Sequence, residues 1–184
     1  MTVKDVVKVQ ATLIGREDVV KYLSGELDNA DTATLNAVDI MTRCVNLTVS
    51  ELAFSHIPMT KTYEVDGTEI VFKDVPDRLL RIVSVTDKRG NNVEYEYSPE
   101  KLSAKKSGLI FTYNYLPKNY QIDDQIEYAE EVLPLRVIAY GSLAEYLLTQ
   151  RAFDESVMWR NRFVSELTLL LTPKNSKIKE RRWC

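Results

Sequence analysis

The chain has 184 residues, of which 45% are hydrophobic and 28% are charged, so its length and composition fit one globular domain or one domain with a substantial insertion. No apolar run approaches the roughly 20 residues that span a bilayer, and charged residues among the first ten positions interrupt the apolar stretch that a signal peptide needs. The net charge is −3, but residues 174–184 carry five basic side chains against one acidic, which leaves an acidic body of −7 that is a poor general binder of nucleic acid.

Residues 1–59 are predicted to form the N-terminal helices. The stretch REDVVKYLSG gathers three apolar side chains on one face of a short helix, and Gly25 is a suitable stop signal. These side chains are Val19, Val20 and Leu23. A longer helix follows, for which Asp31 or Thr32 is a good N-cap.

The longer helix has apolar residues at close to the helical period. They are Leu35, Val38, Met41, Val45, Val49 and Leu52. Pro58 is predicted to end this part of the chain, because the residue before a proline is pushed out of the α region.

Residues 60–131 are predicted to be a β insertion, because the apolar period changes to the alternation of strands. The stretch KTYEVDGTEIVF predicts two strands around an Asp-Gly turn, and RLLRIVSVTD, KRGNN and NVEYEYS predict a second hairpin. LIFTYNY and QIEYAE are the remaining strands, which makes a small antiparallel sheet or sandwich of about five or six strands. Side chains that share one face are Val93, Tyr95 and Tyr97, and Phe111, Tyr113 and Tyr115.

Residues 132–172 are predicted to form the C-terminal helices. LPLRVIAYGSLAEYLLTQ has only Arg136 and Glu145 as charged residues, so its helix should be covered on more than one side, and one covering surface could belong to another subunit. The last helix is predicted to bury one apolar stripe that three further side chains widen. The stripe is Phe153, Val157, Val164, Leu167 and Leu171, widened by Trp159, Phe163 and Leu170. Pro173 ends this helix, and residues 173–184 are predicted to be an extended tail.

This order of segments predicts an α+β fold. Neither helical end can bury its apolar stripe alone, so the N-terminal and C-terminal helices are expected to pack together into a helical bundle. The small antiparallel β-sheet or sandwich is then an insertion into that bundle, and the extended tail follows it.

The sequence contains no catalytic or cofactor-binding motif. Its six glycines form neither a phosphate-binding loop nor a dinucleotide fingerprint, and no Gly-x-Ser-x-Gly elbow is present. The single histidine, His56, is expected to cap a helix or lie at the surface, and it forms no zinc ligand set with two distant cysteines. We therefore expect no enzymatic activity, no cofactor and no bound metal.

Two further groups of reactive side chains favour structural roles. Cys44 lies beside the apolar stripe of the longer helix and is expected to be a buried, inert thiol. Cys184 is expected to be exposed, and two such cysteines make no disulfide framework, which fits a cytosolic, reducing environment. Several acidic side chains cluster around the last expected strand. This segment lacks the glycine turn and the ligand spacing of a calcium loop, so we favour a turn and a solvated strand edge over a cation-binding or acid–base site. The acidic side chains are Asp123, Asp124, Glu127, Glu130 and Glu131.

Two segments are candidates for contact with a partner. The hairpin tip DKRGNN presents Lys88, Arg89 and Asn91; a solvated turn is the favoured interpretation, and a contact with DNA or a partner is the alternative. The C-terminal tail combines arginine with tryptophan, the residue types most enriched at binding hot spots. Docking on a partner is favoured for the tail over packing on its own body or disorder.

Four stretches, together with the helix–β–helix order, are similar to one protein family. They are RCVNLTVSELAFSHIP, GLIFTYNYLP, AYGSLAEYLLTQRAFDESVMWRNRFVSEL and the terminal KERRW. On these stretches the chain resembles the head–tail connector (adaptor) proteins of tailed bacteriophages. Each stretch is a packing pattern and not a catalytic motif, and with the order of segments the likeness covers most of the chain.

The resemblance implies a virion protein of the neck, at the capsid–tail junction, made in the host cytoplasm. Such proteins form a homo-oligomeric ring, commonly of about twelve copies, below the portal protein. The ring extends the DNA channel and links the capsid to the next neck or tail protein, and genomic DNA passes through its lumen without sequence-specific binding. No membrane is involved.

The family is similar in reaching into the portal ring with its C-terminal segment. Carried over to this chain, the portal-docking residues are Lys177, Lys179, Arg181, Arg182 and Trp183. The alternative function is that of a small DNA-binding or regulatory protein whose basic tail binds phosphates.

Overall fold

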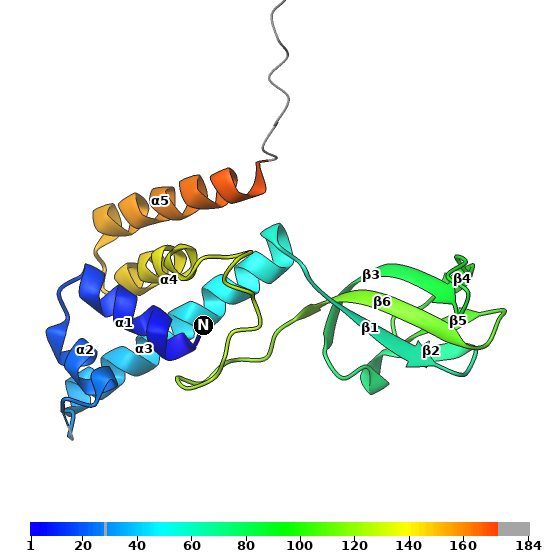
Figure 1. The fold of residues 1–184 in the computed structure, drawn as a ribbon, viewed down its shortest axis with the longest axis horizontal. Helices are drawn as coiled ribbons and strands as arrows, with labels where there is room; N and C mark the ends of the chain where they lie inside the picture. The colour runs from blue at the N-terminus through cyan, green and yellow to red at the C-terminus, as the bar shows by residue number, and fades with distance from the viewer. Residues whose placement is uncertain (28, 173–184) are drawn as a thin grey trace, which may run out of the picture. The chain divides into compact units, whose positions relative to one another are not determined.

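The computed structural model describes residues 1–27 and 29–172. These residues form five α-helices and two three-stranded antiparallel sheets, so the chain belongs to the α+β class. They fall into two compact units, whose elements can be followed in Figure 1. The helical unit consists of residues 1–45 and the described residues from 120 onward, and the β unit consists of residues 46–119. The predicted β insertion covers residues 60–131.

The helices begin and end close to the signals in the sequence. They are α1 (Val3–Leu13), α2 (Glu17–Ser24), α3 (Thr32–Glu51), α4 (Leu135–Thr149) and α5 (Phe153–Leu171). Gly25 ends α2 in the left-handed region, with φ of 77°. The Asp31 carboxylate accepts the backbone N–H of Thr34 at 2.7 Å in the first turn of α3. A π-helical turn, Leu52–His56, follows α3 and precedes Pro58.

The apolar pattern alone did not predict α1, but its N-terminus carries a clear signal. The Thr2 hydroxyl accepts the backbone N–H of Asp5 at 3.2 Å, and the Asp5 carboxylate accepts the backbone N–H of Thr2 at 3.0 Å. This reciprocal pair is a capping box. The same helix buries one face, which consists of Val3, Val6, Val7, Gln10 and Ala11.

The near-continuous apolar helix of the sequence is α4, which packs against α1 and against α5 (Figure 1). Its buried residues are Val137, Ile138, Ala139, Gly141, Ser142, Leu143, Ala144, Tyr146 and Leu147. Gln10 of α1 donates a buried hydrogen bond to Ser142. The expectation that α4 is covered on more than one side is therefore confirmed, and the helices of its own chain supply the cover.

The expected buried face of α5 was only partly right. Trp159, Phe163 and Leu167 are buried, as is Ser156. Four other members of the expected stripe, together with Leu170, lie in solvent: they are Phe153, Val157, Val164 and Leu171. The physical reason is that α5 packs mainly on a single helix, α4, which covers only one side of a helix that is apolar on several.

The last expected strand, QIEYAE, does not form. Only Gln125 makes an isolated bridge, to Thr2, and the segment from residue 120 onward belongs to the helical unit. Its apolar side chains are buried there instead of lining a sheet. They are Tyr120, Ile126, Tyr128 and Leu133.

The six strands of the β unit form two separate sheets. The first has the order β1 (Met59–Val65), β6 (Leu109–Leu116), β3 (Arg78–Asp87), and the second has the order β2 (Glu69–Val71), β5 (Lys101–Ala104), β4 (Tyr95–Tyr97). Strand β5 was not among the predicted strands. The alternation in β6 is confirmed, because Phe111, Tyr113 and Tyr115 are buried, whereas Tyr95 and Tyr97 in β4 are exposed.

Both expected hairpins were wrong in their pairing. β1 and β2 flank the Asp-Gly turn, yet β1 pairs with β6 and β2 pairs with β5. The turn around Gly90 does form, with φ of 81° and a bond from Val93 N–H to the Val85 carbonyl at 3.0 Å. After it the chain leaves the first sheet, and β4 pairs with β5. The turn residues determine where the chain reverses, but the burial of long-range partners determines which strands pair.

Candidate functional site

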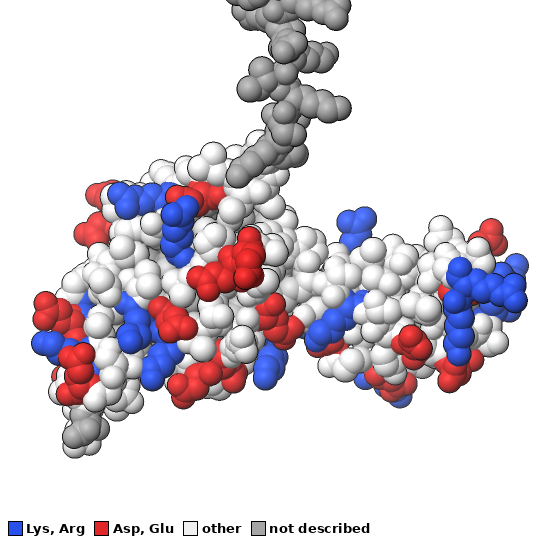
Figure 2. Space-filling model, in the orientation of Figure 1, with Lys and Arg blue, Asp and Glu red and all other residues white. Residues whose placement is uncertain are grey.

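Three connections meet at one end of the β unit. They are the residues between β1 and β2, between β3 and β4, and between β5 and β6. They meet because Val65 of β1 and Asp87 of β3 both lie opposite Leu109, the first residue of β6. We call this surface the basic tip, and its basic residues are Lys88, Arg89, Lys105 and Lys106 around a shallow groove. Figure 2 shows Lys and Arg side chains gathered at this end of the β unit.

Two ion pairs connect the loops of the basic tip. Lys88 Nζ lies 3.0 Å from Asp66 Oδ1, and Lys106 Nζ lies 3.8 Å from Asp87 Oδ2. The Lys88 side chain also crosses Gly108, where an added Cβ would lie 3.4 Å from Lys88 Cε. Gly108 has φ of 71°, so this loop needs glycine for its backbone as well. The loops therefore support one another and do not project independently.

Asp87 organises the turn that carries Lys88 and Arg89. Its carboxylate accepts the backbone N–H groups of Arg89 and Asn91, each at 2.9 Å, and the Asn91 side-chain amide at 3.1 Å. The bonds from Asn91 are the main reason that the pKa of Asp87 is lowered. Asn91 is thus directed toward the turn itself.

The basic tip carries an excess of positive charge, because it holds four basic side chains and two carboxylates. Among the residues that the structure describes, the side chains of Arg89 and Lys105 pair with no carboxylate. Arginine and lysine at such a rim bind carboxylates or phosphates of a partner. The sequence pointed to Lys88 and Arg89, but it did not indicate Lys105 and Lys106, whose only signal is the pair of lysines in AKKSG.

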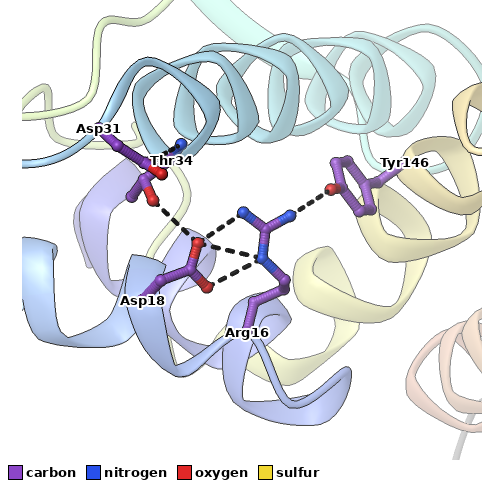
Figure 3. Close-up of polar contacts among 5 residues, drawn as sticks. All are labelled: Arg16, Asp18, Asp31, Thr34 and Tyr146. Carbon is purple, nitrogen blue, oxygen red and sulfur yellow. Dashed lines mark hydrogen bonds and ion pairs between the residues drawn. The ribbon is translucent and has the colours of Figure 1, made fainter.

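A second polar cluster lies in the helical unit, at the corner between α1 and α2 (Figure 3). Arg16 donates to the Asp18 carboxylate from Nε at 2.9 Å and from Nη2 at 2.6 Å. The Thr34 hydroxyl of α3 donates to the same carboxylate at 2.9 Å. Arg16 Nη1 also reaches the Tyr146 hydroxyl of α4 at 3.5 Å. Four segments are therefore joined by one arginine–carboxylate pair.

The Arg16 guanidinium, followed by the Thr34 hydroxyl, holds the pKa of Asp18 well below its usual range. A carboxylate in this state is a permanent anion at neutral pH, and both of its oxygens are already occupied by donors. The cluster is therefore suited to hold the corner between α1 and α2 and not to transfer protons.

The remaining candidate residues lie apart from both clusters. His56 Nε2 is 3.8 Å from Glu51 Oε1 at the end of the π-helical turn. Cys44 is buried, and its burial, with a smaller effect from Glu145, raises its pKa to about 12. In residues 1–27 and 29–172 no group of three or more His, Cys, Asp and Glu side chains could hold a metal ion. No helix within these ranges is long and apolar enough to cross a membrane.

The expected portal-docking residues lie outside the described residues. They are Lys177, Lys179, Arg181, Arg182 and Trp183, and Cys184 lies outside with them. No protein-family model matches the chain, and no curated protein matches it. The functional argument therefore depends on the residues and the fold themselves.

We expect Asp18→Asn to lower the free energy of unfolding at pH 7 by about 1 kcal/mol, because a neutral amide cannot accept the charge-assisted bonds of Arg16. The 40% exposure of the Asp18 side chain keeps this value small. Because the folded pKa of Asp18 is lowered from 3.8, its stabilisation is complete above that pH and is lost as the pH falls toward the folded pKa. Urea unfolding between pH 7 and pH 2 measures the difference, which should shrink at the acid end.

The matched control for this prediction is Asp39→Asn. Asp39 pairs with Arg43 at 2.6 Å on the exposed surface of α3, and such a pair contributes little to stability. A difference between Asp18→Asn and the wild type that stays constant from pH 7 to pH 2 would contradict the role given to Asp18.

We expect Asp87→Ala to lower the melting temperature by a few degrees, because two backbone N–H groups of the basic tip lose their acceptor. Asp66→Ala removes only the exposed partner of Lys88 and should leave the melting temperature unchanged within error. Differential scanning calorimetry of the two variants makes the comparison. Equal effects of the two changes would show that Asp87 acts only as a surface charge.

Proposed function

We propose that the chain is a structural adaptor of a tailed-phage virion, which forms a ring below the portal and links capsid to tail. One observation carries the proposal: the two ends of one polypeptide build the helical unit, and a β unit is inserted between them. This is the order of segments on which the resemblance to head–tail connector proteins depends. We further propose that the helices of the two ends form a bundle in the assembled ring, followed by an extended tail.

The proposed activity is assembly and not catalysis. Copies of the helical unit stand side by side in a ring of about twelve, and the ring continues the DNA channel of the portal. The acidic charge of the chain outside its C-terminal segment supports this, since a channel wall that repels phosphates lets the genome pass without binding it. Genomic DNA, the portal protein and the next neck or tail protein are the proposed partners, and the virion neck is the proposed location.

The proposed roles of the two basic surfaces differ. The C-terminal residues Lys177, Lys179, Arg181, Arg182 and Trp183 dock on the portal. Many identical tails in one ring act together, so weak single contacts give a strong attachment. The basic tip, with Lys88 and Arg89 at its turn, contacts a neighbouring subunit or the tail-side ring.

Deletion of residues 174–184 is expected to leave a folded protein that no longer binds portal rings. Within the segment, Trp183→Ala should weaken binding more than Lys174→Ala, because a tryptophan buries a large area at an interface and a single exposed lysine does not. Circular dichroism checks the fold, and electron microscopy of the protein mixed with portal rings measures the binding. A ring on the portal with about twelvefold symmetry is the expected image.

Two outcomes would contradict the proposal. One is unchanged portal binding after deletion of residues 174–184. The other is tight, strongly salt-dependent binding of the full chain to duplex DNA that disappears with the tail, which would favour a DNA-binding or regulatory protein.

A further inference from the structure

Helix α5 carries an apolar surface that the described residues of its own chain leave in water. Phe153, Val157, Val164 and Leu171 recur at spacings of four and seven residues, so they share one face of the helix. Their exposed fractions are 60%, 59%, 48% and 48%. We call these residues the α5 stripe. Because α5 packs mainly on α4 through its other residues, the α5 stripe is free to contact another molecule.

The helical unit also has an apolar groove, between α1 and α2. Its floor and walls include Ala11, Thr12, Gly15 and Val20, and its volume is about 330 Å³. Gly15 has φ of 70°, and no side chain fills the space beside it. We call this feature the α1–α2 groove. Its shape depends on the corner that Arg16 and Asp18 hold, since that corner joins the two helices.

The two features lie on different helices of the helical unit. Helix α2 packs on α1, α1 packs on α4, and α4 packs on α5, so α4 lies between the two helices of the groove and the helix that carries the stripe (Figure 1). One chain therefore cannot place its own α5 stripe in its own α1–α2 groove. A second copy can, and the contact then repeats from one copy to the next.

The charges of the two surfaces are complementary. Arg160 lies three residues after Val157 and four before Val164, so it is on the same face as the α5 stripe. Its Nη1 lies 4.0 Å from Glu145 Oε1 of α4, and its guanidinium lies over the Phe163 ring, at the edge of the stripe next to α4. Glu17 and Glu26 lie at the α1–α2 groove, where Lys21 is the one basic residue. The stripe therefore has an arginine at its edge, and the groove has an excess of carboxylates.

We propose that the α5 stripe of one copy binds in the α1–α2 groove of a neighbouring copy. Phe153 has the size and exposure to fill the groove, and Arg160 meets the carboxylates at its edge. Two different patches make a heterologous contact, which continues from copy to copy and closes into a ring when the rotation between copies allows it. The inference rests on the proposed ring, and it names the surfaces by which the copies meet.

Disulfide cross-linking tests the geometry directly. In a Cys184→Ser background, Val157→Cys and Thr12→Cys are made in separate proteins, which are then mixed and oxidised, both free and on portal rings. Buried Cys44 stays unreactive in each protein. The expected product is a dimer that contains one copy of each variant, and a chain with both changes should give a ladder of higher oligomers. A dimer of Val157→Cys with itself, or no cross-link in either setting, overturns the proposal.

Charge substitution tests the energetics. Val157→Glu should weaken self-association at least tenfold in sedimentation velocity experiments. Met158→Glu is the matched control, because Met158 is also exposed on α5 but lies on a different face, and it should leave association unchanged. Equal effects of the two variants would overturn the proposal. Circular dichroism of both variants ensures that a loss of association does not come from unfolding.

The same variants separate this inference from the proposed function. If Val157→Glu abolishes self-association and the wild-type chain fails to bind portal rings, the interface stands and the adaptor function is wrong. If Val157→Glu still forms complete rings on the portal, the adaptor function stands and the interface is wrong.

Discussion

The packing of α1 against α4 holds the helical unit together. The buried hydrogen bond from Gln10 to Ser142 joins residues that are 132 positions apart, and the whole β unit lies in the sequence between them. Both side chains are completely buried, and Gln10 Oε1 has no partner, so the contact carries an energetic cost as well as a gain. Closing a chain segment of this length costs entropy that only a well-packed interface can offset. The burial of α1 on α4 provides that interface, and the β unit can differ in its strands without disturbing it.

The central position of α4 explains the distribution of apolar surface in the helical unit. A helix with two charged residues in its apolar stretch must be enclosed, and α1 and α5 are the helices that enclose it. As an outer layer, α5 then has only one side to bury, although its sequence is apolar on several. The α5 stripe is the surplus that results. Exposed apolar surface of this kind is needed for assembly, because a subunit that buried all of its apolar residues would have no apolar surface with which to bind a neighbour.

The sequence predicted those features that depend on neighbouring residues. Gly25 and Asp31 mark the ends of helices through local backbone geometry, and both were placed correctly. Strand pairing depends on residues far apart in the chain. The Asp-Gly turn after β1 therefore predicted where the chain reverses, but it did not predict the strand with which β1 pairs. For the same reason, the sequence did not predict the whole basic tip. Lys88 and Arg89 stood out at a turn, whereas Lys105 belongs to the site only because β5 and β6 bring its loop beside theirs. The sequence of α5 is apolar on several sides, so its buried face is known only once the position of α4 is known.

At the basic tip and at the corner between α1 and α2, the carboxylates stabilise the loops, and other groups are available to bind partners. At the tip, Asp87 is occupied by backbone N–H groups of the turn, and at the corner Asp18 is occupied by Arg16 and Thr34. Each carboxylate fixes a loop through these hydrogen bonds. The groups that remain for partners are others: Arg89 and Lys105 at the tip, and the apolar walls of the groove beside the corner. Loss of an acidic residue at either place should therefore act through stability, and loss of the exposed residues should act through binding. This separation allows assembly to be changed by substitution while the fold of a single copy is kept.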